Sequence, residues 1–110
     1  MMYNEIMIGI DIVRIERVSL EKAFLEKVLT EKERELLERY KNEQRKKEIV
    51  AGRFAVKEAY FKATKDKDYL KISVLKKEDG SPYIEDHEDL DVSISHDAGI
   101  AIAIVSSRQS

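Results

Sequence analysis

The feature that most constrains the fold is one long segment, residues 45–65, that contains no proline. Alanine recurs through it, and apolar residues including Ile49, Phe54 and Phe61 recur with the period of a helix. Seven of its side chains are basic and only two are acidic, in a chain whose net charge is −2. The segment therefore predicts a long central helix on which positive charge is concentrated.

The composition limits the size and environment of the fold. A chain of 110 residues with 43% apolar residues can bury one core, which predicts a single domain over residues 1–110. Cysteine is absent, so disulfides and thiolate metal sites are excluded. No apolar run has the length of a membrane span, and the first residues lack the pattern of a signal peptide. We expect a cytoplasmic protein that does not contact membranes.

The N-terminal half predicts a strand followed by helices. The spacing of Thr30 and Glu33 is that of a capping box, which predicts a helix from this point to about Tyr40. The expected elements are a strand at 5–12 with Gly9 allowing close backbone approach, one or two amphipathic helices within 13–29, the capped helix, a break at 42–44 and the central helix at 45–65.

The hydrophobic period changes to two after residue 70, which predicts strands. Glycine, proline and acidic residues mark the turns between them. The expected strands are 71–77, 83–85, 90–96 and 99–106, with Asp97-Ala98 as a close hairpin and the last strand apolar enough to be central. This order predicts an α+β fold, an antiparallel sheet with helices packed on one face.

Three polar features in this pattern are candidates for chemistry: Asp11, Glu58 with its neighbouring lysines, and Ser95-His96 at a strand end. Asp11 lies in an apolar strand, where a carboxylate is costly to bury unless a cation meets it. Glu58 and Lys62 share one face of the central helix, and Lys57 flanks them. Two carboxylates suit Mg²⁺, which takes its other oxygens from water and phosphates, and the lysines could hold phosphate. The alternatives are a strand-end aspartate and an ordinary ion pair along a helix.

Other function classes have weaker support. No glycine-rich phosphate loop is present, so ATPase and dinucleotide-binding folds are not indicated. His96 could be a metal ligand, an acid or base, or a residue that caps a hairpin. A nucleic-acid module on the basic helix is a further alternative, but the negative net charge and the 7% aromatic content argue against it.

Four motifs resemble one known family. The segments at 9–12 (Gly-Ile-Asp-Ile), 51–63 (Ala-Gly-Arg-Phe-Ala-Val-Lys-Glu-Ala-Tyr-Phe-Lys-Ala), 80–83 (Gly-Ser-Pro-Tyr) and 92–96 (Val-Ser-Ile-Ser-His) are similar to the holo-acyl-carrier-protein synthases, the short phosphopantetheinyl transferases. Their order and spacing match along nearly the whole chain. The motif at 51–63 is highly specific, whereas the shorter motifs are weak alone.

The resemblance implies an enzyme of fatty acid biosynthesis that moves the 4′-phosphopantetheine group of coenzyme A onto a serine of apo acyl carrier protein, with release of adenosine 3′,5′-bisphosphate. It implies Asp11 and Glu58 as ligands of Mg²⁺, with Lys62 as the third catalytic residue that neutralises charge on the transferred phosphate. The proton of the serine could be removed by Glu58 or by a metal-bound water, and the sequence leaves this choice open.

The resemblance also implies binding surfaces. Members of the family form homotrimers whose active sites lie between subunits, and the acidic helix of the carrier protein would meet a basic face formed by Arg14, Arg17 and Lys22. The residues expected to contact coenzyme A are Arg45, Arg53, Lys57, Lys62, Gly80, Ser81, Pro82 and His96.

The chain departs from the family pattern in two places. The family usually follows its Lys-Ala pair with a glycine-containing loop and a longer insertion, whereas residues 64–68 here contain no glycine. Arg14 stands where an acidic or polar residue is common, which would alter carrier recognition. The altered loop supports one alternative function, a non-catalytic module that binds coenzyme A or a carrier protein.

Overall fold

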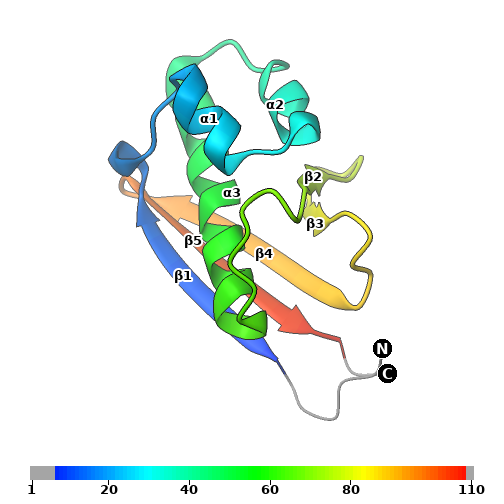
Figure 1. The fold of residues 1–110 in the computed structure, drawn as a ribbon. Coiled ribbons are helices and arrows are strands. Elements are labelled where there is room, and N and C mark those ends of the chain that lie inside the picture. Colours follow the sequence, from blue (N-terminus) through cyan, green and yellow to red (C-terminus); the bar gives the residue numbers. More distant parts are fainter. Residues whose placement is uncertain (1–6, 109–110) are drawn as a thin grey trace.

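A computed structural model describes residues 7–108, and Figure 1 shows the arrangement of their helices and strands. The predicted strand residues 5–6 and the tail residues 109–110 lie outside the described part of the chain. The elements in order are β1 (Ile8–Arg14), the 3-10 turn η1 (Ile15–Arg17), α1 (Lys22–Val28), α2 (Glu31–Leu37), α3 (Glu43–Thr64), β2 (Val74–Lys76), β3 (Pro82–Ile84), β4 (Leu90–Asp97) and β5 (Ile100–Ser107).

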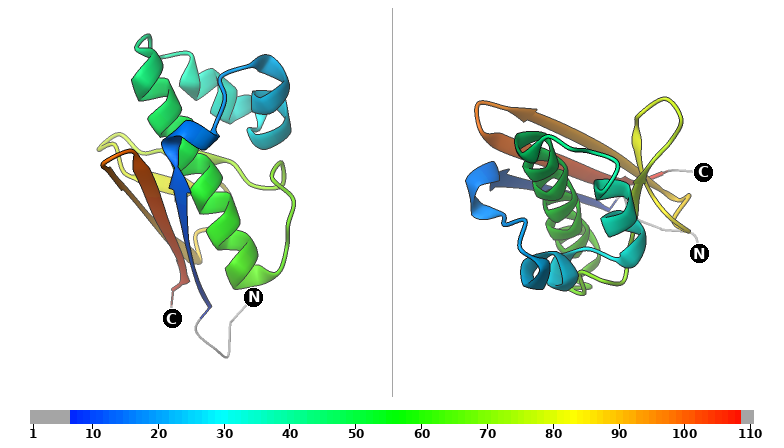
Figure 2. Two further views of the ribbon diagram at one scale, coloured as in Figure 1. Left: turned by 90° about the vertical axis from the view of Figure 1, so that its left-hand side faces the viewer. Right: turned by 90° about the horizontal axis from the view of Figure 1, so that it is seen from above.

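The main sheet is antiparallel and has the strand order β1-β5-β4, and β2 and β3 form a separate antiparallel pair. The helices gather on one face of the three-stranded sheet (Figure 2). The predicted α+β fold with an antiparallel sheet is thus confirmed, and the apolar last strand is central as expected. Within residues 7–108, no helix has the length and apolar character needed to cross a membrane.

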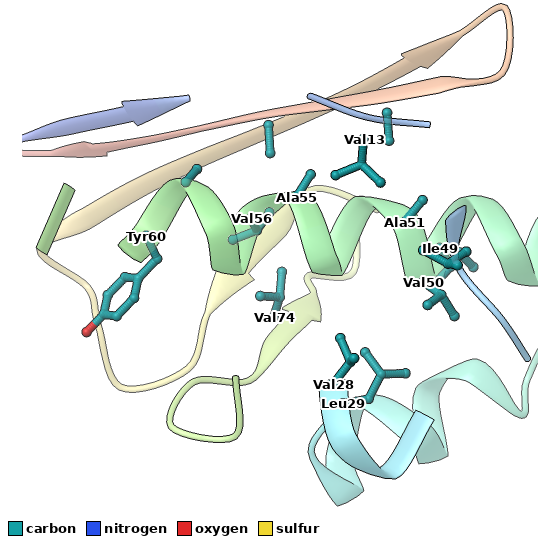
Figure 3. Packing of buried hydrophobic residues seen from close by; sticks show 14 of the residues in the cluster. Val13, Val28, Leu29, Ile49, Val50, Ala51, Ala55, Val56, Tyr60 and Val74 are labelled. Atoms are coloured by element: carbon teal, nitrogen blue, oxygen red, sulfur yellow. The ribbon is translucent and has the colours of Figure 1, made fainter. Parts of the chain in front are cut away.

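Small residues bring α3 close to the sheet. Ala51 and Ala55 are fully buried and lie on the side of α3 that faces the strands (Figure 3). Gly9 of β1 has the closest approach, since a Cβ atom there would lie 1.9 Å from the carbonyl oxygen of Ala59. The sequence-based expectation that Gly9 allows a second backbone to approach is therefore correct, and this contact fixes β1 against the C-terminal half of α3.

The opposite side of α3 is also covered. Val50 packs near Val28 and Leu29 at the end of α1, and Val56 packs near Val74 of β2 (Figure 3). The helix is therefore buried on two sides, not along the single apolar stripe that the sequence indicated. This position in the middle of the molecule explains why basic residues of α3 can be either buried or exposed.

Capping residues set the ends of α2 and α3. The side chain of Thr30 accepts a hydrogen bond from the Glu33 amide, and the Glu33 carboxylate accepts one from the Thr30 amide, so the predicted capping box is present. Asn42 Oδ1 accepts from the Arg45 amide at 2.8 Å. This cap starts α3 at Glu43, two residues before the predicted start.

Three features of the strands also differ from the prediction. β1 continues to Arg14, beyond the predicted end at Ile12, because Val13 and Arg14 keep pairing with β5. The hairpin between β4 and β5 turns at Ala98 and Gly99, which have positive φ angles of 51° and 77°, and not at Asp97-Ala98. The predicted strand at 71–77 is reduced to β2, since only three of its residues pair with β3.

Candidate active site

The first group of candidate residues lies at the β1 edge of the sheet. Asp11 is on the face of β1 that carries the buried residues Gly9 and Val13, so its side chain is directed to the α3 side. Lys62 of α3 donates to Asp11 Oδ1 at 3.1 Å and to the Ile10 carbonyl at 3.0 Å. The Asp11 side chain is 16% exposed and that of Lys62 is 54% exposed, so the pair lies at the surface.

Glu58 lies one helical turn before Lys62 on α3 and is partly buried. Its Oε2 atom accepts a hydrogen bond from the hydroxyl of Tyr69 at 3.4 Å. The ring of Tyr69 in turn lies 5.5 Å from the ring of Phe54. Of the three predicted catalytic residues, Lys62 contacts Asp11 directly and lies one turn from Glu58 along α3. Tyr69, which was not predicted, joins this group through its contact with Glu58.

The electrostatics of Tyr69 link the two carboxylates. Burial raises the pKa of its hydroxyl most, and the charge and hydrogen bond of Glu58 raise it further. The charge of Asp11 also raises this pKa, while Arg17 lowers it. The charges of both carboxylates and of Arg17 thus act on the Tyr69 hydroxyl.

Of the predicted carrier-binding residues, Arg17 borders this region, since its guanidinium carbon lies 5.8 Å from the centre of the Phe54 ring. Arg14 and Lys22 are exposed, and Arg14 lies 3.8 Å from the exposed Glu16. Arg14 follows the buried Val13 on β1, so its side chain is on the sheet face away from Asp11 and α3. Binding of a carrier protein to these three residues remains a prediction.

The second group of candidate residues lines a groove at the β4 edge of the sheet. The groove has a volume of about 120 Å³ and lies between the N-terminal half of α3, the β2–β3 pair and β4. Five residues predicted to bind coenzyme A are part of its lining. The lining consists of Arg45, Glu48, Ile49, Gly52, Arg53, Lys76, Gly80, Pro82, Ile94 and His96.

Arg45 and Arg53 of this groove differ in burial and in their hydrogen-bond partners. Arg45 is half-buried, and its Nη1 atom lies 3.3 Å from both Glu48 Oε1 and His96 Nε2. Arg53 is 4% exposed and donates from Nε to the Val74 carbonyl at 3.1 Å. Burial lowers the pKa of Arg53, and Glu33 opposes this shift. Its Nη2 atom is buried without a hydrogen-bond partner, so one donor is left for an acceptor that enters the groove.

Three residues predicted to bind coenzyme A lie elsewhere, and one of them, Lys62, belongs to the group at the β1 edge. Ser81 does not line the groove, and its amide and hydroxyl donate to Asp79 within the turn. Lys57 is 3% exposed and donates to the Val28 carbonyl, Glu33 Oε1 and the Tyr69 carbonyl. An ammonium group has three hydrogens, so Lys57 has no donor left for a phosphate, in contrast with the prediction.

The sequence reasoning missed several residues of these sites. Tyr69 is absent from the predicted site residues, and Glu33 is predicted as a cap but not as the partner of Lys57. Lys76 of β2 lines the groove and donates to the hydroxyl of Tyr40 at 2.6 Å. The spacing along the chain gave no signal for any of these contacts, because each joins separate elements.

The donor set at the β1 edge is small. Among residues 7–108, no group of three or more histidine, aspartate or glutamate side chains is arranged to hold a metal ion. A metal at Asp11 and Glu58 would therefore have only two protein carboxylates. This number suits Mg²⁺, which keeps several waters and takes other oxygens from substrate phosphates.

Comparison with known sequences gives one family. Residues 7–105 match the family described as the 4′-phosphopantetheinyl transferase superfamily. The chain is 36% identical over 109 residues to the holo-[acyl-carrier-protein] synthase of Petrotoga mobilis, with 87% of this chain and 90% of the relative covered. It is 38% identical over 108 residues to that of Acholeplasma laidlawii, with 89% and 92% covered.

Solved structures give the same result. The holo-(acyl-carrier-protein) synthase of Bacillus anthracis, in complex with CoA (3′,5′-ADP), superposes with a TM-score of 0.82 at 38% identity and covers 94% of this chain and 96% of its own. That of Helicobacter pylori, in complex with coenzyme A, has a TM-score of 0.73 at 36% identity, with 90% and 97% covered. The similarity thus extends over nearly the whole fold in both proteins.

Proposed function

Because this chain belongs to the 4′-phosphopantetheinyl transferase superfamily, as an enzyme of the holo-[acyl-carrier-protein] synthase family, we propose that it transfers the 4′-phosphopantetheine group of coenzyme A to a serine of apo acyl carrier protein. The second product is adenosine 3′,5′-bisphosphate. The observation that carries this proposal is the hydrogen bond from Lys62 to Asp11, which places Asp11 beside the face of α3 that also carries Glu58. Family membership argues against the alternative of a non-catalytic binding module.

The metal of the proposed reaction is Mg²⁺, held by Asp11 and Glu58. The donor set supports this choice, since it offers only carboxylate oxygens and leaves room for water and phosphate. When bound, Mg²⁺ would withdraw charge from the pyrophosphate oxygens of coenzyme A. Binding of Mg²⁺ would affect Lys62 most directly, because the Lys62 ammonium donates to Asp11, one of the two proposed ligands.

The proposed step is the attack of the carrier serine on the phosphorus bonded to the pantetheine arm. The serine oxygen forms the new bond, and adenosine bisphosphate leaves with the electrons of the broken bond. Lys62 neutralises the charge that builds on the phosphoryl oxygens, since its side chain is 54% exposed and open to a substrate. Glu58 is a candidate to accept the serine proton, because its carboxylate is partly exposed at the same place.

The groove at the β4 edge is the proposed site for the adenosine end of coenzyme A. Arg45, Arg53 and His96 supply charge and hydrogen-bond donors for its phosphates, and the turn at 80–82 borders the adenine. The unpartnered Nη2 atom of Arg53 supports this role. A volume of about 120 Å³ is too small to enclose the coenzyme, so the groove would hold only part of it.

The proposed assembly is a homotrimer with active sites between subunits. Two observations support it. The catalytic group lies at β1 and the groove at β4, which are opposite edges of the sheet, and no hydrogen bond or salt bridge among residues 7–108 joins them. On β1 and β5, the sheet face away from the helices carries exposed isoleucines, which suits burial against other subunits. Its largest exposed residues are Ile8, Ile10, Ile12 and Ile102.

The proposed partner is an acyl carrier protein that presents an acidic helix to Arg14, Arg17 and Lys22. The position of Arg17 supports this partner, because Arg17 packs on Phe54 and Phe54 packs on Tyr69, which donates to Glu58. The chain would then act in fatty acid biosynthesis in the cytoplasm, as a single phosphopantetheinyl transferase domain over residues 1–110.

The proposal is tested by incubating the protein with Mg²⁺, coenzyme A and apo acyl carrier protein and weighing the carrier by mass spectrometry. We expect a mass increase equal to one phosphopantetheine group, and its loss when Mg²⁺ is chelated. Coenzyme A that binds saturably without any modified carrier would support the non-catalytic alternative. Absence of both binding and product with several carriers would contradict the proposal.

A further inference from the structure

The loop that joins α3 to β2, residues 65–73, carries a tyrosine that no motif of the sequence marked. The hydroxyl of Tyr69 lies 3.4 Å from Glu58 Oε2, and its ring packs against Phe54 at 5.5 Å between centroids. Tyr69 is half-buried, so the contact with Glu58 is not a transient meeting of two surface side chains. Hydrogen bonds from a buried ion pair hold this loop in place.

One buried ion pair holds the middle of the loop and the start of β2 that follows it. Lys57 donates to the carbonyl oxygen of Tyr69 at 2.6 Å and to Glu33 Oε1 at 2.5 Å. The other oxygen of Glu33, Oε2, accepts a hydrogen bond from the Val74 amide at 2.7 Å, where β2 begins. Both side chains are at most 1% exposed. The main chain at residues 69 and 74 is therefore fixed to the interior of the protein through one Lys–Glu pair.

The consequence for Glu58 is geometric. A carboxylate on a helix surface can rotate about its side-chain bonds, and each orientation presents its oxygens differently. The Tyr69 hydroxyl donates to Glu58 Oε2. No residue in 7–108 donates to Glu58 Oε1, so this oxygen is open to a metal ion. Hydrogen bonds to a metal-binding carboxylate from outside the ligand set orient it and affect metal affinity.

We propose that Tyr69 is a positioning residue that orients Glu58 for metal binding, and that the buried Lys57–Glu33 pair holds Tyr69 in place to do so. The inference rests on the proposed function, because it takes Glu58 as a metal ligand. It gives a role to the part of the loop that follows the glycine-free segment at 64–68. It also explains why Lys57 is buried although it adjoins Glu58 in the sequence.

The test uses Tyr69→Phe, which keeps the ring against Phe54 and removes only the hydroxyl. Binding of Mn²⁺, a paramagnetic substitute for Mg²⁺, is measured by electron paramagnetic resonance with coenzyme A present. We expect Mn²⁺ affinity about tenfold lower, at the weak end of such effects because the hydrogen bond is long. The kcat for carrier modification should fall by a similar factor, while KM for coenzyme A changes by less than about twofold.

Tyr60→Phe is the matched control, since it also removes one tyrosine hydroxyl. The Tyr60 ring is buried on α3 and packs against His87. It should leave Mn²⁺ affinity and kcat unchanged. Equal Mn²⁺ affinity in Tyr69→Phe and the wild type would overturn the inference, as would an equal loss in both variants. Wild-type protein that binds Mn²⁺ more tightly than Tyr69→Phe but modifies no carrier would support the positioning role and contradict the proposed reaction.

Discussion

Two lysines of α3 give the clearest contrast in this molecule. Lys57 and Lys62 lie five residues apart, and each pairs with a carboxylate from another element. The side chains of Lys57 and its partner Glu33 are 1% and 0% exposed. Burial lowers the pKa of Lys57, and the charge of Glu33 opposes that shift. Lys62 is 54% exposed and pairs with Asp11 at the surface. The same residue type thus occupies opposite environments on one helix.

The contrast teaches that burial, and not motif membership, separates structural from functional lysines here. A buried ammonium must satisfy every hydrogen, and Lys57 does so with three acceptors. Lys62 has two protein acceptors and remains open to water, so it can exchange a partner for a substrate oxygen at low cost. Removing Lys57 should therefore affect stability, and removing Lys62 should affect catalysis.

The largest expected effect is on stability. Lys57→Met would leave the Glu33 carboxylate buried without a cation, which should lower the free energy of unfolding by about 3–5 kcal/mol. Urea denaturation at one fixed protein concentration measures this, as a lower midpoint with an unchanged slope. Lys46→Met, on the partly exposed first part of α3, is the control and should change the free energy by less than about 0.5 kcal/mol. A loss below about 1 kcal/mol for Lys57→Met would mean that the buried pair behaves like a surface pair.

The second effect is on activity. Lys62→Met should reduce kcat by about 10²- to 10³-fold, because a cation that neutralises charge in the transition state is lost. Its free energy of unfolding should change by at most about 1 kcal/mol, since the pair with Asp11 is exposed. Single-turnover kinetics with apo carrier, together with urea denaturation, separate the two quantities. A variant with normal kcat would show that Lys62 has no role in the reaction.

The smallest effect concerns the contact that brings Asp11 to Lys62. In Gly9→Ala the new methyl group would meet the backbone of Ala59 at 1.9 Å, so β1 must move away from α3, at a cost of about 1–3 kcal/mol in unfolding free energy. Gly52→Ala is the control, because its methyl would meet only the Ile94 side chain at 3.1 Å and alanine favours the helix. Equal stabilities of the two variants would show that the close approach at Gly9 is not required.

The sequence predicted much of the local structure for physical reasons that act over a few residues. The capping box at Thr30 and Glu33 and the period-two pattern of β4 and β5 are of this kind. The start of α3 was placed two residues late because the Asn42 cap was taken as part of a break. The end of β1 was placed early because its continuation depends on pairing with β5, which lies almost 90 residues away in the chain.

The candidate site divides in the same way. The identity of Asp11, Glu58 and Lys62 followed from their charge, their spacing and the family resemblance. The contact of Tyr69 with Glu58 could not be predicted, since it depends on how a loop without hydrophobic period is anchored. The burial of Lys57 was likewise hidden, because its partner Glu33 lies on α2, separated from it by 24 residues.

By itself, the sequence determined the helices, most strands, the central place of the last strand and the chemical groups available for catalysis. These depend on periodicity, capping and residue type, which are local properties. Only the tertiary structure decided which cations are accessible and which carboxylates they meet. Accessibility depends on the packing of α3 between the sheet on one side and α1, α2 and β2 on the other, and that packing joins residues far apart in the chain.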